Sequence, residues 1–162
     1  MLTNEEIERY IKIEKELPKG KFKTNKTDRY YECDIQLNCD AINNVKFNVF
    51  IRQHIEMDHN FSIGLSIKLQ NKGTERRFNL YRFNGAKSQH MTAHHRFPHI
   101  HILTEEDIIL NRENKPSNIK ILNENISFNN AILYFVREIN IINAENYFEF
   151  LIMDELFNDE QN

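Results

Sequence analysis

Apolar and polar residues alternate in several stretches of the first half of the chain, which predicts β-strands. In the clearest stretch, residues 61–69, Phe61, Ile63 and Leu65 begin a series of apolar residues separated by polar or small ones. Successive side chains of a strand point to opposite faces, so each strand has one buried side and one solvent-facing side. We expect strands at residues 29–37, 45–55, 61–69 and 76–83, joined by short turns into an antiparallel meander, and a further short strand at 99–103.

The two ends of the chain follow the helical period instead. Thr3 is an expected N-cap with Glu6 completing a capping box, and Pro18 and Gly20 are expected to end this first helix. Ser127 precedes apolar residues with a period of about 3.6, and a second apolar stripe follows Asn143. The predicted fold class is α+β: a single domain, residues 1–162, with one curved antiparallel sheet of four to five strands packed against an N-terminal helix and two C-terminal helices.

Composition narrows the class of protein. A length of 162 residues and a hydrophobic content of 40% fit one domain with a packed core. The formal net charge of −3 excludes a protein that is basic throughout, although it allows a local basic patch. No apolar run approaches the roughly 20 residues that span a bilayer, and the N-terminus is acidic where a signal peptide is basic. We expect a cytoplasmic protein without membrane association, in which Cys33 and Cys39 stay reduced.

Charge is distributed unevenly along the chain. The segment from Lys68 to Arg96 contains seven basic residues and one acid, Glu75. The segment after Glu138 contains six acidic residues and no basic one, which is typical of a solvated tail. The basic segment leads directly into an unusual cluster of histidines.

Five of the seven histidines fall within twelve residues: His90, His94, His95, His99 and His101. In a strand, His99 and His101 share one face while Ile100 lies on the other, so their rings are expected to be close together. Two adjacent imidazoles can act as an acid and a base, can bind a metal, or can grip an anion. A purely structural role is the alternative, and for the histidines before residue 99 it is the interpretation that we favour.

The acid–base interpretation suits cleavage of RNA without a metal. One histidine would remove the proton of the 2′-hydroxyl, the other would protonate the leaving oxygen, and a cation would hold the phosphate. Tyr81 and Phe83, expected on the side opposite Phe78 and Leu80, could stack on a base. The candidate catalytic residues are His99, His101 and Arg82, and the candidate substrate-binding residues are Tyr81, Lys87 and Arg96.

The metal interpretation uses the same histidines differently. Zinc needs three or four nitrogen, sulfur or oxygen ligands. His99 and His101 would supply two, and the preceding loop would supply the others through His94 and His95. His90 and Glu105 are further candidates for this site.

The segment from Tyr81 to Glu105 resembles an uncharacterised family of bacterial and prophage domains. Its members have a strand ending in Arg-x-Asn-Gly, a histidine-containing loop, and the string His-Ile-His-x-x-Thr-Glu leading into a helix. Here these elements are Arg82–Gly85 and His99–Glu105. The layout is more distantly similar to TumE-type toxins of toxin–antitoxin modules. The resemblance covers roughly a sixth of the chain and implies the location of a site rather than a reaction.

Two hypotheses of different kinds follow. In the first, the chain is a small protein of a mobile element or prophage whose histidine site handles RNA or nucleotide phosphates, as a ribonuclease-like toxin or other phosphodiesterase-like hydrolase would. In the second, it is a non-catalytic interaction protein, antitoxin-like or an anti-defence inhibitor, whose charged faces bind a cognate protein partner.

Overall fold

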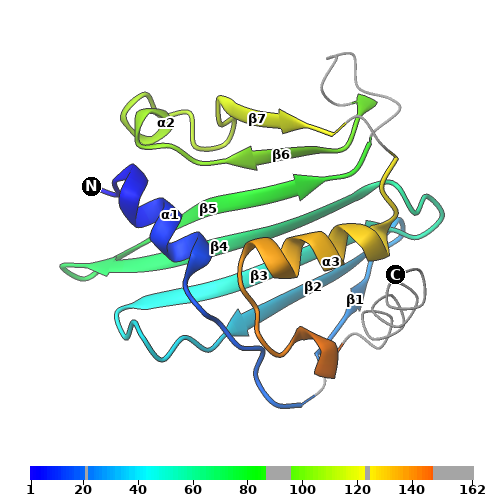
Figure 1. The fold of residues 1–162 in the computed structure, drawn as a ribbon, viewed down its shortest axis with the longest axis horizontal. Coiled ribbons are helices and arrows are strands. Elements are labelled where there is room, and N and C mark those ends of the chain that lie inside the picture. The colour runs from blue at the N-terminus through cyan, green and yellow to red at the C-terminus, as the bar shows by residue number, and fades with distance from the viewer. Residues whose placement is uncertain (21, 87–95, 123–124, 148–162) are drawn as a thin grey trace, which may run out of the picture.

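The computed structural model describes residues 1–20, 22–86, 96–122 and 125–147, and its centre is one antiparallel sheet (Figure 1). Each strand pairs with the strand before it in the sequence, so that the sheet order is β1 to β7. The α+β fold class is therefore confirmed, whereas the expected count of four to five strands is wrong. The strands are β1 (Asn25–Lys26), β2 (Tyr30–Leu37), β3 (Val45–His54), β4 (Phe61–Asn71), β5 (Thr74–Asn84), β6 (His99–Ile102) and β7 (Asn118–Ile121).

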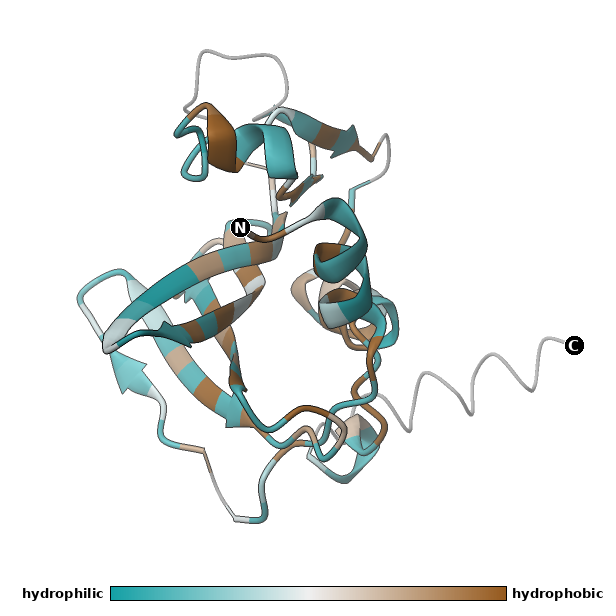
Figure 2. Ribbon diagram, turned by 90° about the vertical axis from the view of Figure 1, so that its left-hand side faces the viewer, coloured by the Kyte–Doolittle hydropathy of each residue, from teal (hydrophilic) through white to brown (hydrophobic). Residues whose placement is uncertain are grey.

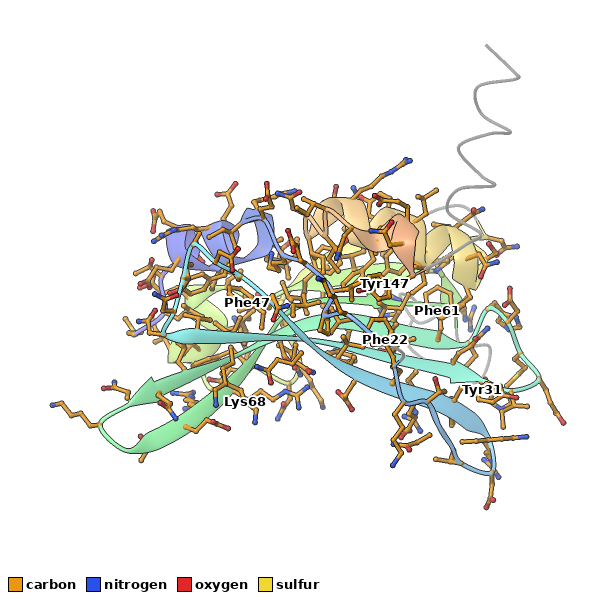
Figure 3. The ribbon with its side chains drawn as sticks, turned by 90° about the horizontal axis from the view of Figure 1, so that it is seen from below. Phe22, Tyr31, Phe47, Phe61, Lys68 and Tyr147 are labelled. Carbon is orange, nitrogen blue, oxygen red and sulfur yellow. The ribbon has the colours of Figure 1, made fainter. Side chains whose placement is uncertain are left out.

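Two helices cover one face of this sheet, as Figure 3 shows: α1 (Asn4–Lys12) and α3 (Phe128–Glu138). Both begin at the expected caps, since the Thr3 side chain accepts from Glu6 N and the Ser127 side chain accepts from Asn130 N. A short helix, α2 (Glu105–Ile109), joins β6 to β7. The second expected C-terminal helix begins in the structure only as a 3-10 turn at Ala144–Asn146, and the rest of its apolar stripe lies outside the described residues.

Helix α1 ends at Lys12, before the expected stop at Pro18 and Gly20. The reason is Lys15, whose side chain is 1% exposed and turns back to the end of the helix. Its ammonium group donates to the backbone carbonyls of Ile11 at 2.9 Å, Ile13 at 2.7 Å and Ile139 at 2.8 Å. One buried lysine side chain thus donates to carbonyls at the ends of both α1 and α3.

The apolar side chains of the strands gather on the face beneath α1 and α3, which we call the core face. Ile63, Leu65 and Ile67 of β4 are 0% exposed, and the colouring of Figure 2 shows the alternation of apolar and polar residues along the strands. The polar residues lie on the opposite side, which neither α1 nor α3 covers (Figure 3), and which we call the open face.

A β-bulge in β5 changes which residues reach the core face. Leu65 pairs with Tyr81 but Ser66 pairs with Asn79, so that Leu80 is an extra residue in β5. The extra residue shifts the alternation by one position. Consequently Phe78 and Tyr81 both lie opposite core-face residues of β4, and the prediction that Tyr81 and Phe83 lie on the side opposite Phe78 is wrong.

Candidate functional site

The open face carries rows of side chains that run across neighbouring strands, and three of these rows contain a basic residue. The register fixes these rows, because residues paired across strands point to the same side of a sheet. The first row is Lys46, Lys68 and Arg77; the second is Asp34, Phe50, Gly64, Arg82 and His101; the third is Glu32, Arg52, Ser62, Asn84 and His99. Glu32 forms an ion pair with Arg52 at 3.2 Å.

The first row, which we call the cation row, places three basic residues next to each other on β3, β4 and β5. Neighbouring strands lie about 4.8 Å apart, so the three residues originate within about 10 Å of one another. Lys68 forms an ion pair with Glu75 at 2.8 Å, and this hydrogen bond and charge lower the pKa of Glu75. Lys46 and Arg77 are exposed. Like charges directly opposite each other destabilise a sheet, and the single carboxylate of Glu75 offsets only part of the repulsion among the three cations.

The second row combines an aromatic ring with a cation. Gly64 lies between Phe50 and Arg82, and the Phe50 ring covers it so closely that a Cβ atom at this position would overlap the ring. Arg82 is half-buried, and burial lowers the pKa of its guanidinium group, which still stays charged at neutral pH. Its Nε atom is buried without a hydrogen-bond partner in the described part of the chain. The row therefore offers a partly desolvated positive charge beside an aromatic surface.

His99 is fully buried, at 0% exposed, and hydrogen bonds hold both of its ring nitrogens. Nδ1 lies 2.9 Å from the carbonyl oxygen of Phe97, and Nε2 lies 3.4 Å from Nδ2 of Asn84. Ser62 donates its hydroxyl to Oδ1 of the same asparagine at 2.6 Å. A carbonyl only accepts and an amide NH₂ only donates, so this pattern fits the neutral ring with its proton on Nδ1.

His101 lies beside His99, and their ring centroids are 4.9 Å apart with an angle of 75° between the planes. It is 6% exposed and is the direct partner of Arg82 across β5 and β6. The structure therefore brings together the three predicted catalytic residues, His99, His101 and Arg82. His99 is held by Phe97 and Asn84, and His101 lies directly opposite Arg82.

The two predicted substrate-binding residues that the structure describes, Tyr81 and Arg96, do not join this group. Tyr81 is 1% exposed, and its ring packs against Phe135 of α3 with ring centroids 5.7 Å apart. The prediction that Tyr81 stacks on a base is therefore wrong, because its side chain is part of the hydrophobic core. Arg96 is exposed and lines an open pocket of about 700 Å³ with His59 and Ser127. Lys87 lies outside the described residues.

The metal interpretation finds two of its ligands in the structure. His99 and His101 are adjacent, but no group of three or more histidine, cysteine, aspartate or glutamate side chains within the described ranges could hold a metal ion. His90, His94 and His95 lie outside those ranges. Glu105 begins α2, where its backbone N–H donates to Oδ1 of Asn4 at 2.9 Å.

Sequence reasoning missed Lys46 and Phe50 as site residues. The alternation of β3 does place Lys46 on a polar side, but only the register with β4 shows that it lies beside Lys68. Phe50 interrupts the polar side of β3 with an aromatic residue, and this irregularity is the signal that could have identified it.

Comparisons of the chain with protein-family models, with curated proteins and with solved structures gave no match. None of the helices in the part of the chain that the structure describes is long and apolar enough to cross a membrane.

Proposed function

We propose that this protein binds single-stranded RNA on its open face, through the phosphates and one base. The observation that carries the proposal is the cation row, Lys46, Lys68 and Arg77, which lies on the same face as Arg82 and Phe50. Surfaces that bind single strands combine a positively charged track for the backbone with aromatic rings on which bases stack. The open face has both parts within a few strands.

Each part has a defined role in this proposal. The cation row contacts successive phosphates, Arg82 contacts a further phosphate beside His101, and Phe50 stacks on a base. Stacking of a base on an aromatic ring contributes about 1–3 kcal/mol and depends little on sequence. The protein is thus expected to bind many RNA sequences, with an affinity that falls as salt rises.

Cleavage of the bound RNA is the catalytic extension of the proposal, in line with the resemblance to toxins of mobile elements. In that extension His101, beside the phosphate-binding Arg82, exchanges the proton with the substrate. His99 orients the neighbouring ring, since its own nitrogens bind Phe97 and Asn84. Incubating labelled RNA with the wild-type protein and with His101→Gln tests this step: cleavage by the first and not by the second supports it.

Binding is tested by fluorescence anisotropy with a labelled single-stranded RNA of about 12 nucleotides. The variant Lys46→Gln/Lys68→Gln/Arg77→Gln should bind more weakly. In a plot of log affinity against log salt, its slope should be smaller in magnitude by about 2, because each lost phosphate contact removes about 0.7 on single strands. A chelator in the buffer should leave binding unchanged, because side-chain cations rather than a metal make the contacts.

A second triple variant, Lys19→Gln/Lys23→Gln/Lys115→Gln, is the matched control. It removes the same charge at exposed positions outside the three rows, so that it separates the cation row from an effect of net charge. Equal losses in the two variants would contradict the proposal. Absence of RNA binding by the wild-type protein would also contradict it, and would favour the interaction protein with a cognate partner.

A further inference from the structure

A second pocket, on the core side of the molecule, lies apart from the open face. It occupies about 420 Å³ between α1, the end of β6 and the end of α3, and we call it the α1 pocket. Residues of five elements line it, among them Ile7 and Ile11 from α1, Tyr81 from β5, Ile102 from β6 and Glu138 from α3, together with Asn118 from β7.

The walls of the α1 pocket are mainly aliphatic. Ile7 and Ile11 belong to the buried stripe of α1, and Ile102 and Leu103 face them from the chain that leaves β6. Such a surface binds the apolar body of a small molecule, because water leaves both surfaces when they meet.

One polar atom in this region has no partner. Tyr81 lines the pocket and is 1% exposed, yet its hydroxyl makes no hydrogen bond in the described part of the chain. Burial raises the pKa of this hydroxyl strongly, and the nearby Tyr134 and Glu138 raise it further. The group therefore stays protonated and is a hydrogen-bond donor. A buried donor without an acceptor is unfavourable and calls for an explanation.

Charged side chains at the rim of the pocket determine which ligand charge it favours. Lys12 forms an ion pair with Glu138 at 3.5 Å, and Glu8 adds a further carboxylate at the rim. These three residues leave an excess of one negative charge, which disfavours a phosphate or carboxylate ligand. The hydroxyl of Thr104 is already occupied, because it accepts from Asp107 N and donates to Asp107 Oδ2.

We propose that the α1 pocket binds a small uncharged molecule with an apolar body and one hydrogen-bond acceptor, and that Tyr81 donates its hydroxyl to that acceptor. The apolar body lies between Ile7, Ile11 and Ile102. This site is independent of RNA binding on the open face.

Two probe molecules of nearly the same shape test the proposal. Acetophenone carries a carbonyl acceptor, and cumene has a methyl group in its place. Each is titrated into protein labelled at the isoleucine methyl groups and followed by NMR. Acetophenone should shift the methyl signals of Ile7, Ile11 and Ile102 but not that of Ile35, which lies on β2. Acetophenone should bind about five-fold more tightly than cumene, because its carbonyl accepts one neutral hydrogen bond that cumene cannot form.

The variant Tyr81→Phe isolates the hydroxyl. It removes only an unpaired group, so the fold should persist, and the two probes should then bind equally. A second variant, Ile102→Phe, adds side-chain volume at a half-buried wall and should weaken both probes. The proposal is overturned if neither probe shifts the three methyl signals, if the probes bind equally to the wild-type protein, or if the preference for acetophenone survives Tyr81→Phe.

Discussion

At the scale of single residues, the hydrogen bonds of His99 distinguish the two histidines of β6. The ring donates to a backbone carbonyl on one side and accepts from the Asn84 amide on the other. Its neighbour His101 is paired with Arg82 across β5 and β6. His99 is therefore assigned a structural role, whereas the role of His101 belongs to the proposed cleavage step.

Replacing His99 should destabilise the protein. In His99→Leu the Phe97 carbonyl and the Asn84 amide each lose a buried partner, and a loss of about 2–4 kcal/mol in the free energy of unfolding is expected. Urea unfolding measures this value. The exposed His59 is the control, since His59→Leu should change the stability by less than about 0.5 kcal/mol. If His99→Leu is as stable as the control variant, the structural role assigned to His99 is incorrect.

At the scale of elements, the buried carboxylate of Asp107 holds α2 against the chain that leads into β7. Its side chain is 0% exposed. Its oxygens accept from the hydroxyls of Thr104 at 2.8 Å and Ser117 at 2.9 Å, and from the backbone N–H groups of both residues. Burial alone would raise the pKa of Asp107, but these hydrogen bonds outweigh it and lower the pKa. The charged form therefore stabilises the fold above the ordinary pKa of 3.8, and this contribution is lost as the pH falls further.

The variant Asp107→Ala should lower the free energy of unfolding by about 3 kcal/mol, because four donors lose their acceptor at once. Its neighbour provides a matched control: the Glu106 side chain is 72% exposed and lies 4.0 Å from Arg112. Glu106→Ala should cost less than about 0.5 kcal/mol. Amide hydrogen exchange locates the effect, with faster exchange in α2 and β7 for the first variant alone. Faster exchange spread evenly over the sheet would argue against a local clamp.

Most elements could be predicted from the sequence because their alternation or caps are local signals. The exceptions each have a physical reason. Strand β1 has two exposed residues, too few to show a period. The extra residue in β5 shifts the phase of the alternation, so a strict alternation predicts the wrong face for Tyr81. The end of α1 depends on a lysine three residues beyond it, and the position of Lys46 beside Lys68 depends on register, which alternation alone does not specify.

At the scale of the whole molecule, Lys15 connects segments from the two ends of the described chain. Its backbone pairs with the segment after α3, with Lys15 N donating to the Asn140 carbonyl at 3.0 Å and Ile142 N donating to the Lys15 carbonyl at 3.0 Å. Its ammonium group binds carbonyls at the ends of both helices that cover the core face. Burial lowers the pKa of Lys15 to about 7.

Lys15 should therefore make the stability of the protein depend on pH. Between about pH 7 and 10.5 the unfolded chain binds a proton at Lys15 that the folded protein has released, so the free energy of unfolding rises with pH. The expected contribution is at most about 1.4 kcal/mol per pH unit. Urea unfolding across this range should show a smaller slope for Lys15→Met than for the wild type. The exposed Lys19 is the control, and Lys19→Met should keep the wild-type slope. Equal slopes for all three proteins would disprove the assignment.

The sequential order of the sheet also has a consequence for the growing chain on the ribosome. Each new strand finds its partner in the strand made just before it, so the sheet can extend one hairpin at a time during translation. Helix α1 is synthesised before the sheet that it packs against. Its Tyr10 contacts Phe47 of β3, and α1 also contacts β5, which begins only at Thr74. An isolated helix of nine residues is not stable in water. Helix α1 is thus expected to be among the last elements to become ordered, because it docks onto a sheet that has already formed.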